Sequence, residues 1–160
     1  MVHLIGVTNH IIQHDAHTIM QLVLDERAAF DAHVAELIAT NDFALLAEEF
    51  SKEARRKAHA STTTLQRLAK EKGIEHRFCD PNSIERKEQG IDNDNKRECF
   101  WLDQIKGCED CSILFVCGDK HFDSFAAKLI GAGFDVQCGR RAGRINVDDF
   151  LKGRVIEIGK

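Results

Sequence analysis

The sequence predicts an α/β fold: an open, mostly parallel sheet of about five strands with helices on both faces. Short apolar runs typical of buried strands recur along the chain, and segments with helical periodicity separate them. Strands that alternate with helices form βαβ units, whose strands run parallel and whose helices cover the sheet. The 160 residues contain one proline and no Gly/Ser-rich linker. We therefore expect a single domain over 1–160.

The first two strands are separated by a long helical pattern. The first strand is expected at 2–7, which reads VHLIGV and is almost continuously apolar. Apolar residues then recur at helical spacing over 18–38, with Thr18 as the expected N-cap. A second apolar run, 43–47, predicts the second strand, and two glutamates follow it.

The next segment predicts one helix and one strand. Ser51 can cap a helix that Gly73 ends, so that one helix is expected over 51–73. The third strand is expected at 74–79, and the proline that follows soon after helps to stop it. The polar segment 82–95 is expected to be a surface loop with a turn of helix.

The second half of the chain continues the alternation. A helix is expected over 96–106, with Trp101 facing inward, and the fourth strand over 113–117. Residues 122–130 have apolar side chains at i, i+3, i+4, i+7 and i+8, the clearest helical pattern in the chain. The fifth strand is expected at 134–138.

The C-terminal segment 139–160 is harder to interpret. It combines a basic cluster, a short helical pattern and a strand-like run at 155–158. We expect it to cover one edge of the sheet or to contact a partner chain, so that a homodimer through this segment is one expectation.

Composition narrows the class of protein. A formal net charge of -4 argues against general nucleic-acid binding, which favours a basic face. No run approaches the length of a membrane span. We therefore expect a cytoplasmic, soluble protein that acts on a small-molecule or peptide substrate, with its six cysteines present as thiols.

Polar residues gather where the expected strands end. In open α/β sheets, ligands bind outside the carboxyl ends of the strands. The residues at those ends are Gly6 and His10, then Glu48 and Glu49, then Asp80, then Gly118, Asp119 and His121. Imidazole and carboxylate together suit Zn, Mn or Co, whereas carboxylates alone suit Mg. Strand ends are also wet, so polar residues occur there without any function. For the same reason we expect replacement of His121 by alanine to leave the fold largely intact.

The motifs at these ends resemble a known family. Residues 118–121 read GDKH, a Gly-x-x-His motif, and 6–10 read GVTNH, which has one residue too many for the same motif. Glu48 or Glu49 follows the second strand, and Arg97 lies in the helix before the fourth. This pattern resembles the TraB/TIKI superfamily, which includes the erythromycin-esterase-like and ChaN-like proteins. The chain would be a minimal single-domain member.

The resemblance implies a metal-dependent hydrolase, in one branch a peptidase. His10 and His121 would hold a divalent transition metal (Mn, Zn or Co) together with Glu48 or Glu49. The ion would lower the pKa of a bound water toward about 7. The spare carboxylate could then take the water's proton, and Arg97 would stabilise the oxyanion or orient a substrate carboxylate. Other branches bind haem, so the resemblance leaves the reaction open.

Two other functions stay open. An Mg-dependent nuclease or phosphohydrolase could use the acidic strand ends, with Arg140, Arg141 and Arg144 on phosphate. Alternatively, a non-enzymatic binding or regulatory domain could keep a pocket without its chemistry.

Overall fold

The computed structural model of the protein describes residues 1–108 and 110–139. The tail expected to cover an edge or to form a dimer, with its strand at 155–158, lies outside the described residues apart from Gly139. The elements, in chain order, are β1 (Val2–Val7), the 3-10 helix η1 (His10–Gln13), α1 (Gln21–Thr40), β2 (Leu45–Glu48), α2 (Lys52–Lys57), α3 (Thr64–Lys72), β3 (Glu75–Phe78), α4 (Ser83–Glu88), α5 (Asp94–Ile105), β4 (Ile113–Gly118), α6 (Asp119–Gly131) and β5 (Val136–Cys138).

The expected fold class is confirmed. Within the described residues, five strands form one sheet in the order β3-β2-β4-β1-β5. Every neighbouring pair is parallel. All carboxyl ends of the strands therefore lie along the same edge of the sheet.

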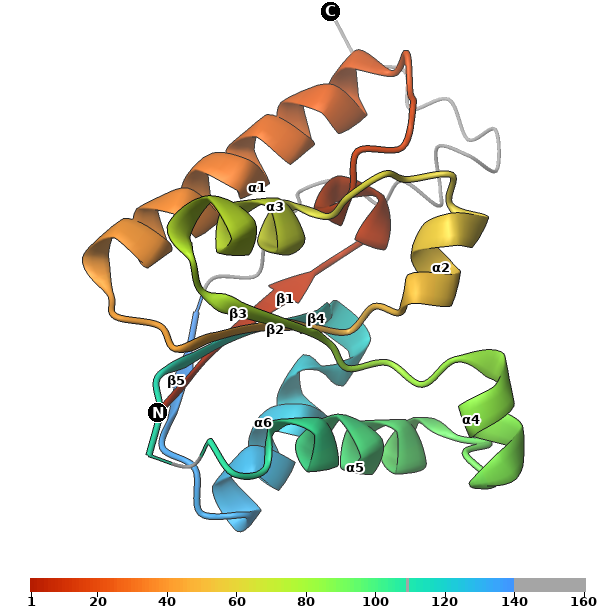
Figure 1. Ribbon diagram of the computed structural model, residues 1–160, viewed down its shortest axis with the longest axis vertical. Helices are drawn as coiled ribbons and strands as arrows, with labels where there is room; N and C mark the ends of the chain where they lie inside the picture. Colours follow the sequence, from red (N-terminus) through yellow and green to blue (C-terminus); the bar gives the residue numbers. More distant parts are fainter. Residues whose placement is uncertain (109, 140–160) are drawn as a thin grey trace, which may run out of the picture.

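The direction of the chain decides which helices cover which face. From β1 the chain runs outward through β2 to β3, and then returns through β4 to β5. Crossovers between parallel strands are right-handed, so a reversal of direction moves the connecting helices to the other face. Accordingly, α1 and α3 lie on one side of the sheet and α5 and α6 on the other (Figure 1).

Two apolar cores result, one on each face. Phe30 of α1 and Leu65 of α3 belong to the first core. Trp101 of α5 and Phe125 of α6 belong to the second, with Phe115 from the sheet. A sheet that is covered on both faces requires apolar side chains at successive strand positions, which explains the continuously apolar runs in the sequence.

The expectation of a single helix over 51–73 is wrong, because two helices occupy that range. Ser51 caps α2, and its side chain accepts a hydrogen bond from a backbone N–H as expected. The chain then leaves the helix, and Thr63 caps α3 by accepting from the N–H of Gln66. Gly73 ends α3 with a φ of 71°, a left-handed conformation that favours glycine.

Several helix boundaries differ from expectation, and one of them concerns the site. Met20, rather than Thr18, is the N-cap of α1, and the Thr18 hydroxyl accepts a hydrogen bond from the Met20 N–H. Helix α6 begins at Asp119, directly after β4, so that His121 lies in its first turn.

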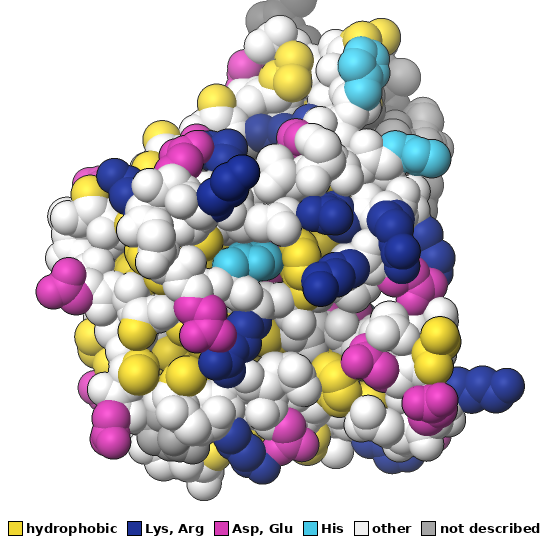
Figure 2. Space-filling view, in the orientation of Figure 1, with side chains coloured by type: hydrophobic (Ala, Val, Ile, Leu, Met, Phe, Trp, Pro, Cys, Tyr) yellow, Lys and Arg dark blue, Asp and Glu magenta, His cyan; other side chains and the backbone are white. Residues whose placement is uncertain are grey.

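Figure 2 shows charged side chains of both signs on one face of the molecule, with Lys and Arg gathered over α2. None of the helices in 1–108 and 110–139 combines the length and the apolar character that crossing a membrane requires.

Candidate functional site

The strand ends meet as the topology requires. β4 lies between β1 and β2, and its last residue, Gly118, pairs in register with Val7 at the end of β1. Glu48 at the end of β2 pairs with both Val116 and Phe78. The chain leaves β1 and β2 toward one face of the sheet and leaves β3 and β4 toward the other. This divergence is the arrangement that opens a crevice at the carboxyl edge.

Glu49 is the centre of the site. Its Oε2 accepts a hydrogen bond of 2.6 Å from the Gly118 N–H, and its Oε1 accepts one of 2.8 Å from Nη2 of Arg97. The same Oε1 lies 3.5 Å from Nε2 of His121 and 3.8 Å from Nε2 of His10. The side chain is buried. One buried carboxylate thus connects residues from four separate segments of the chain.

Position 118 has little room for a side chain. A Cβ atom at this position would lie 3.2 Å from Glu49 Oε2 and 3.2 Å from His10 Nε2. The backbone itself has an ordinary φ of -63°. The glycine therefore serves close approach rather than an unusual backbone conformation.

Arg97 carries the positive charge at the centre of this cluster. Its Nε and Nη2 donate to Asp80 Oδ1 at 3.1 and 2.8 Å, in addition to the Glu49 contact. Burial alone would lower the pKa of Arg97, but the carboxylates of Asp80 and Glu49 together raise it above its ordinary value. Within the described residues, its Nη1 has longer contacts alone, 3.3 Å to His121 and 3.4 Å to Asp94. Nη1 is therefore the least constrained end of the guanidinium.

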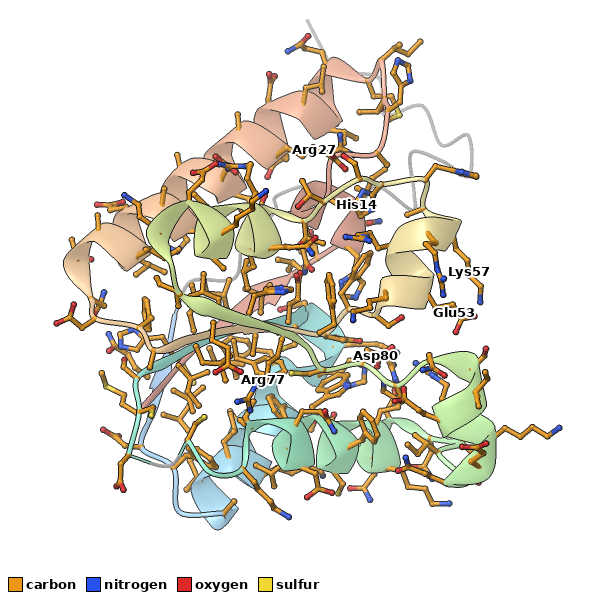
Figure 3. The ribbon with its side chains drawn as sticks, viewed as in Figure 1. His14, Arg27, Glu53, Lys57, Arg77 and Asp80 are labelled. Carbon is orange, nitrogen blue, oxygen red and sulfur yellow. The ribbon has the colours of Figure 1, made fainter. Side chains whose placement is uncertain are left out.

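Asp80 fixes the guanidinium in place. Besides Arg97, its carboxylate accepts hydrogen bonds from the indole N–H of Trp101 at 3.0 Å and from Arg86 at 2.7 Å. Figure 3 shows Asp80 at the end of β3, near α4 and α5. Because its oxygens already accept from three side chains, Asp80 holds Arg97 rather than standing ready for a ligand.

His121 is buried, which corrects the expectation of a wet strand end. Its side chain is 1% exposed, and its ring meets Trp101 edge-on at 4.9 Å between centroids. Nδ1 lies 2.9 Å from Glu98 Oε1. A carboxylate can only accept, so Nδ1 donates and Nε2 is left facing Arg97. Ser124 and Lys128 also contact Glu98.

His10 forms the accessible side of the cluster. It begins η1, and Asn9 caps that turn by accepting from the Ile11 N–H. Its side chain is 38% exposed, in contrast to Glu49 and His121. Asp94 is also exposed; burial alone would raise its pKa, but the hydrogen bonds from Lys120 and Arg97 and the charge of Lys120 lower it. Solvent therefore reaches the cluster from the side of His10 and Asp94.

Glu48 does not join this cluster, although the motif allowed either glutamate. Neighbouring residues at a strand end point to opposite faces of the sheet. The Glu48 side chain consequently lies on the α3 side, where Oε1 accepts from Thr63 at 2.5 Å and lies 2.7 Å from His76 Nε2. Of the pair, the structure brings only Glu49 to Arg97 and His121.

Gly6 and Asp119, also expected in the pocket, lie beside each other. A Cβ on Gly6 would lie 2.9 Å from the Phe122 ring and 3.2 Å from Asp119 Oδ1. The glycine therefore allows β1 to pack against the start of α6, which is a structural role.

A metal centre does not fit the residues as they are arranged. His10, His121 and Glu49 supply suitable donor atoms, but no group of three His, Cys, Asp or Glu side chains within 1–108 and 110–139 is placed to hold a metal ion. Glu49 Oε1 already accepts from Arg97. Metal-ligating imidazoles usually donate their second N–H to a partner, and the buried Nδ1 of His10 has none in the described part of the chain. The expected Mn, Zn or Co ion stays a prediction.

No protein-family profile, curated protein or solved structure matches the chain. The resemblance to the TraB/TIKI superfamily therefore stays a prediction. It rests on the motif around Gly118 and His121, on Arg97 and on one glutamate.

Sequence reasoning missed Glu98, although a signal for it exists. Glu98 precedes Trp101 by three residues and Ile105 by seven, so it lies on the apolar stripe of α5. All three side chains are buried. A carboxylate on a buried helical stripe requires a polar partner, and that partner is His121.

Proposed function

We propose that the protein is a hydrolase whose active site is the cluster around Glu49, with Arg97 rather than a metal ion as the positive charge. The observation that carries this proposal is the set of contacts to the buried Glu49 carboxylate from Arg97, Gly118, His121 and His10. Burying several ionisable groups together costs stability, so a cluster of this kind is a candidate functional site.

His10 and Glu49 are placed to activate a water molecule. Their Nε2 and Oε1 atoms are 3.8 Å apart, too far for a direct hydrogen bond. One water molecule at about 2.8 Å from each atom satisfies both. Neutral His10 would take a proton from that water while Glu49 orients it. Because His10 is exposed, it can return the proton to the leaving group or to solvent.

Arg97 would stabilise the negative charge that develops on the attacked group. Its Nε and Nη2 are fixed by Asp80 and Glu49, whereas the 3.4 Å contact of Nη1 to Asp94 can yield to a substrate oxygen. A preorganised donor of this kind contributes roughly a hundredfold to a thousandfold in rate. An ester or amide carbonyl, whose oxygen gains charge during attack, is the matching substrate group.

His121 acts as a positioning residue, because it is too buried to meet a substrate. Its Nε2 accepts from Arg97 Nη1, and Glu98 holds the ring from the other side. The pair thereby sets the direction of the Nη1 group.

A nuclease of the Mg-dependent type has less support. Glu49 and Asp80 both pair with Arg97, and Asp80 also pairs with Arg86. Glu48 lies on the opposite face of the sheet.

A hydrolysis screen with and without chelator tests the proposal. Purified protein is incubated with chromogenic esters, peptide anilides and phosphate mono- and diesters, first with EDTA and then with added Mn, Zn or Mg. We expect an ester or anilide to be cleaved in EDTA. His10→Gln and Arg97→Lys should lose that activity, whereas His17→Gln, at an exposed histidine, should retain it.

The other outcomes decide against the proposal. Activity that appears only with added metal would replace it with the metal-dependent hydrolase. Cleavage of phosphodiesters alone, with Mg, would favour the nuclease. No cleavage by the wild-type protein would favour a binding domain.

A further inference from the structure

A cavity of about 610 Å³ lies beside the Glu49 cluster. Its walls come from α2, the end of β3 and α4, and Asp80 is part of both the cavity and the cluster. A smaller hollow of about 210 Å³ shares several wall residues with it, Asp80 among them. Asp80 is thus the residue at which the hollowed region adjoins the Glu49 cluster.

Two cations that line the cavity have no side-chain partner in the described part of the chain. Helix α2 reads KEARRK, and its basic side chains form the Lys and Arg group visible in Figure 2. Lys57 pairs with Glu53, and Arg55 donates to Gln66 and lies over the Phe78 ring. Lys52 and Arg56 line the cavity, and within the described residues neither side chain has a hydrogen bond or an ion pair.

Two of the three carboxylates that line the cavity, Glu53 and Asp80, are paired with cations. Glu53 is contacted at 2.5 Å by Lys57 and accepts from a backbone N–H at the start of α4, as Figure 3 helps to show. The hydrogen bond from Lys57 is the main cause that lowers the pKa of Glu53 to about 2. Asp80 is held by Arg97, and Glu85 accepts from the backbone in a capping box. Lys52 and Arg56 therefore outnumber Glu85, the one lining carboxylate without a cation partner in the described residues, and positive charge remains in excess.

The same cavity has apolar surface. The Phe78 ring is part of its wall, and Ile84 is 65% exposed beside it. An exposed isoleucine next to an aromatic ring and two free cations suits a ligand with one apolar and one anionic end.

We propose that this cavity binds a small organic anion, with its charged group on Lys52 and Arg56 and its apolar part against Phe78 and Ile84. The size of the cavity lies within the range of about 300 to 1,000 Å³ that is typical of small-molecule pockets. A small molecule fits the net charge of -4 better than a nucleic acid does. If the protein is the proposed hydrolase, this anion is the substrate of that hydrolase, because Asp80 lines the cavity and also binds Arg97.

Calorimetric titration with a matched pair of probes tests the binding. Phenylbutyrate carries an apolar ring and a carboxylate, and phenylbutyramide has the same shape without charge. Wild type should bind the anion more tightly than the amide. Lys52→Gln combined with Arg56→Gln should weaken anion binding by about tenfold and leave amide binding unchanged, because two exposed charge contacts are lost.

The control is Lys70→Gln combined with Lys72→Gln, which changes the net charge equally on α3, at exposed lysines that do not line the cavity. It should bind both probes as wild type does. Circular dichroism melts establish that each variant is folded. Equal affinity for anion and amide in wild type, no binding of the anion, or equal weakening by both double variants would overturn the inference.

A catalytic variant separates this inference from the proposed function. His10→Gln should lose hydrolysis and still bind phenylbutyrate as wild type does. Loss of the anion preference with hydrolysis intact would end the cavity proposal alone, and absent hydrolysis with the preference intact would end the enzyme proposal alone.

Discussion

The Nδ1 atom of His121 lies 2.9 Å from Oε1 of Glu98, and both side chains are buried. The pair connects the first turn of α6 to the apolar stripe of α5, and the Trp101 ring packs against the imidazole. The residues that organise the site are consequently also residues of the core on that face of the sheet. Substitutions here change stability and activity together, so each prediction needs a control that separates them.

Removal of the His121 ring should destabilise the protein. His121→Ala leaves a cavity beside Trp101 and takes away a hydrogen bond from buried Glu98. We expect the free energy of unfolding to fall by about 2–4 kcal/mol in urea titrations. His17→Ala, at an exposed histidine, should change it by less than about 0.5 kcal/mol. Equal stability of the two variants would show that the His121 ring is not held as described.

The charges of Arg97 and Glu49 should be energetically coupled. Arg97→Met leaves two carboxylates without their main partner and should cost about 3–5 kcal/mol. Glu49→Gln removes one of those charges, so that the double variant should be less destabilised than the sum of the single variants by at least about 1 kcal/mol. Urea unfolding of the three variants measures the coupling. Simple additivity would contradict the contact.

Two glycines offer a test of close packing at the site. Gly118→Ala places a methyl group 3.2 Å from both His10 Nε2 and Glu49 Oε2. We expect it to reduce hydrolysis at least about tenfold by displacing these atoms. Gly131→Ala meets no atom within 4 Å and lies at the end of α6. It should retain activity and gain about 0.5 kcal/mol of stability. Unchanged activity in Gly118→Ala would show that the site tolerates movement.

His14 should contribute to the decrease in the free energy of unfolding of the protein in mild acid. Burial lowers the pKa of His14 in the folded protein, and Arg27 and His10 lower it further, whereas Asp15 raises it. The unfolded chain therefore takes up this proton first, and the free energy of unfolding falls as the pH drops through the ordinary histidine range. His14→Asn keeps a hydrogen-bond acceptor but does not titrate, so stability measured from pH 7.5 to 5.5 should fall less steeply. His17→Asn, at an exposed position, should follow wild type, and the same slope in all three proteins would contradict the prediction.

Much of the fold followed from the sequence because the strands are short, apolar and separated by clear helical periodicity. The convergence of Glu49, Asp80, Gly118 and His121 at one edge followed from the parallel arrangement alone. Strand order did not, because β4 inserts between β1 and β2, and no local pattern encodes that insertion. The one helix expected over 51–73 is in fact two, because Thr63 caps a second helix within that range.

The choice between Glu48 and Glu49 shows a limit of pattern reading. Both faces of this sheet are buried, so the strand has no polar alternation from which its facing could be read. The burial of His121 was missed for a related reason. It depends on Glu98 and Trp101 approaching from a separate helix, which spacing along the chain does not reveal.

The two adjacent glutamates also give the most direct test of the central claim, that the face containing Arg97 and His121 is the catalytic one. Glu49→Gln and Glu48→Gln make the same chemical change one residue apart, on opposite sides of the sheet. The measurement is the initial rate of hydrolysis of the best substrate found with EDTA present, for wild type and for both variants, after urea titration has established the folded fraction of each. We predict that Glu49→Gln loses at least about a hundredfold in rate and that Glu48→Gln retains the wild-type rate per folded molecule. Equal rates in Glu49→Gln and wild type, or a loss confined to Glu48→Gln, would contradict the account.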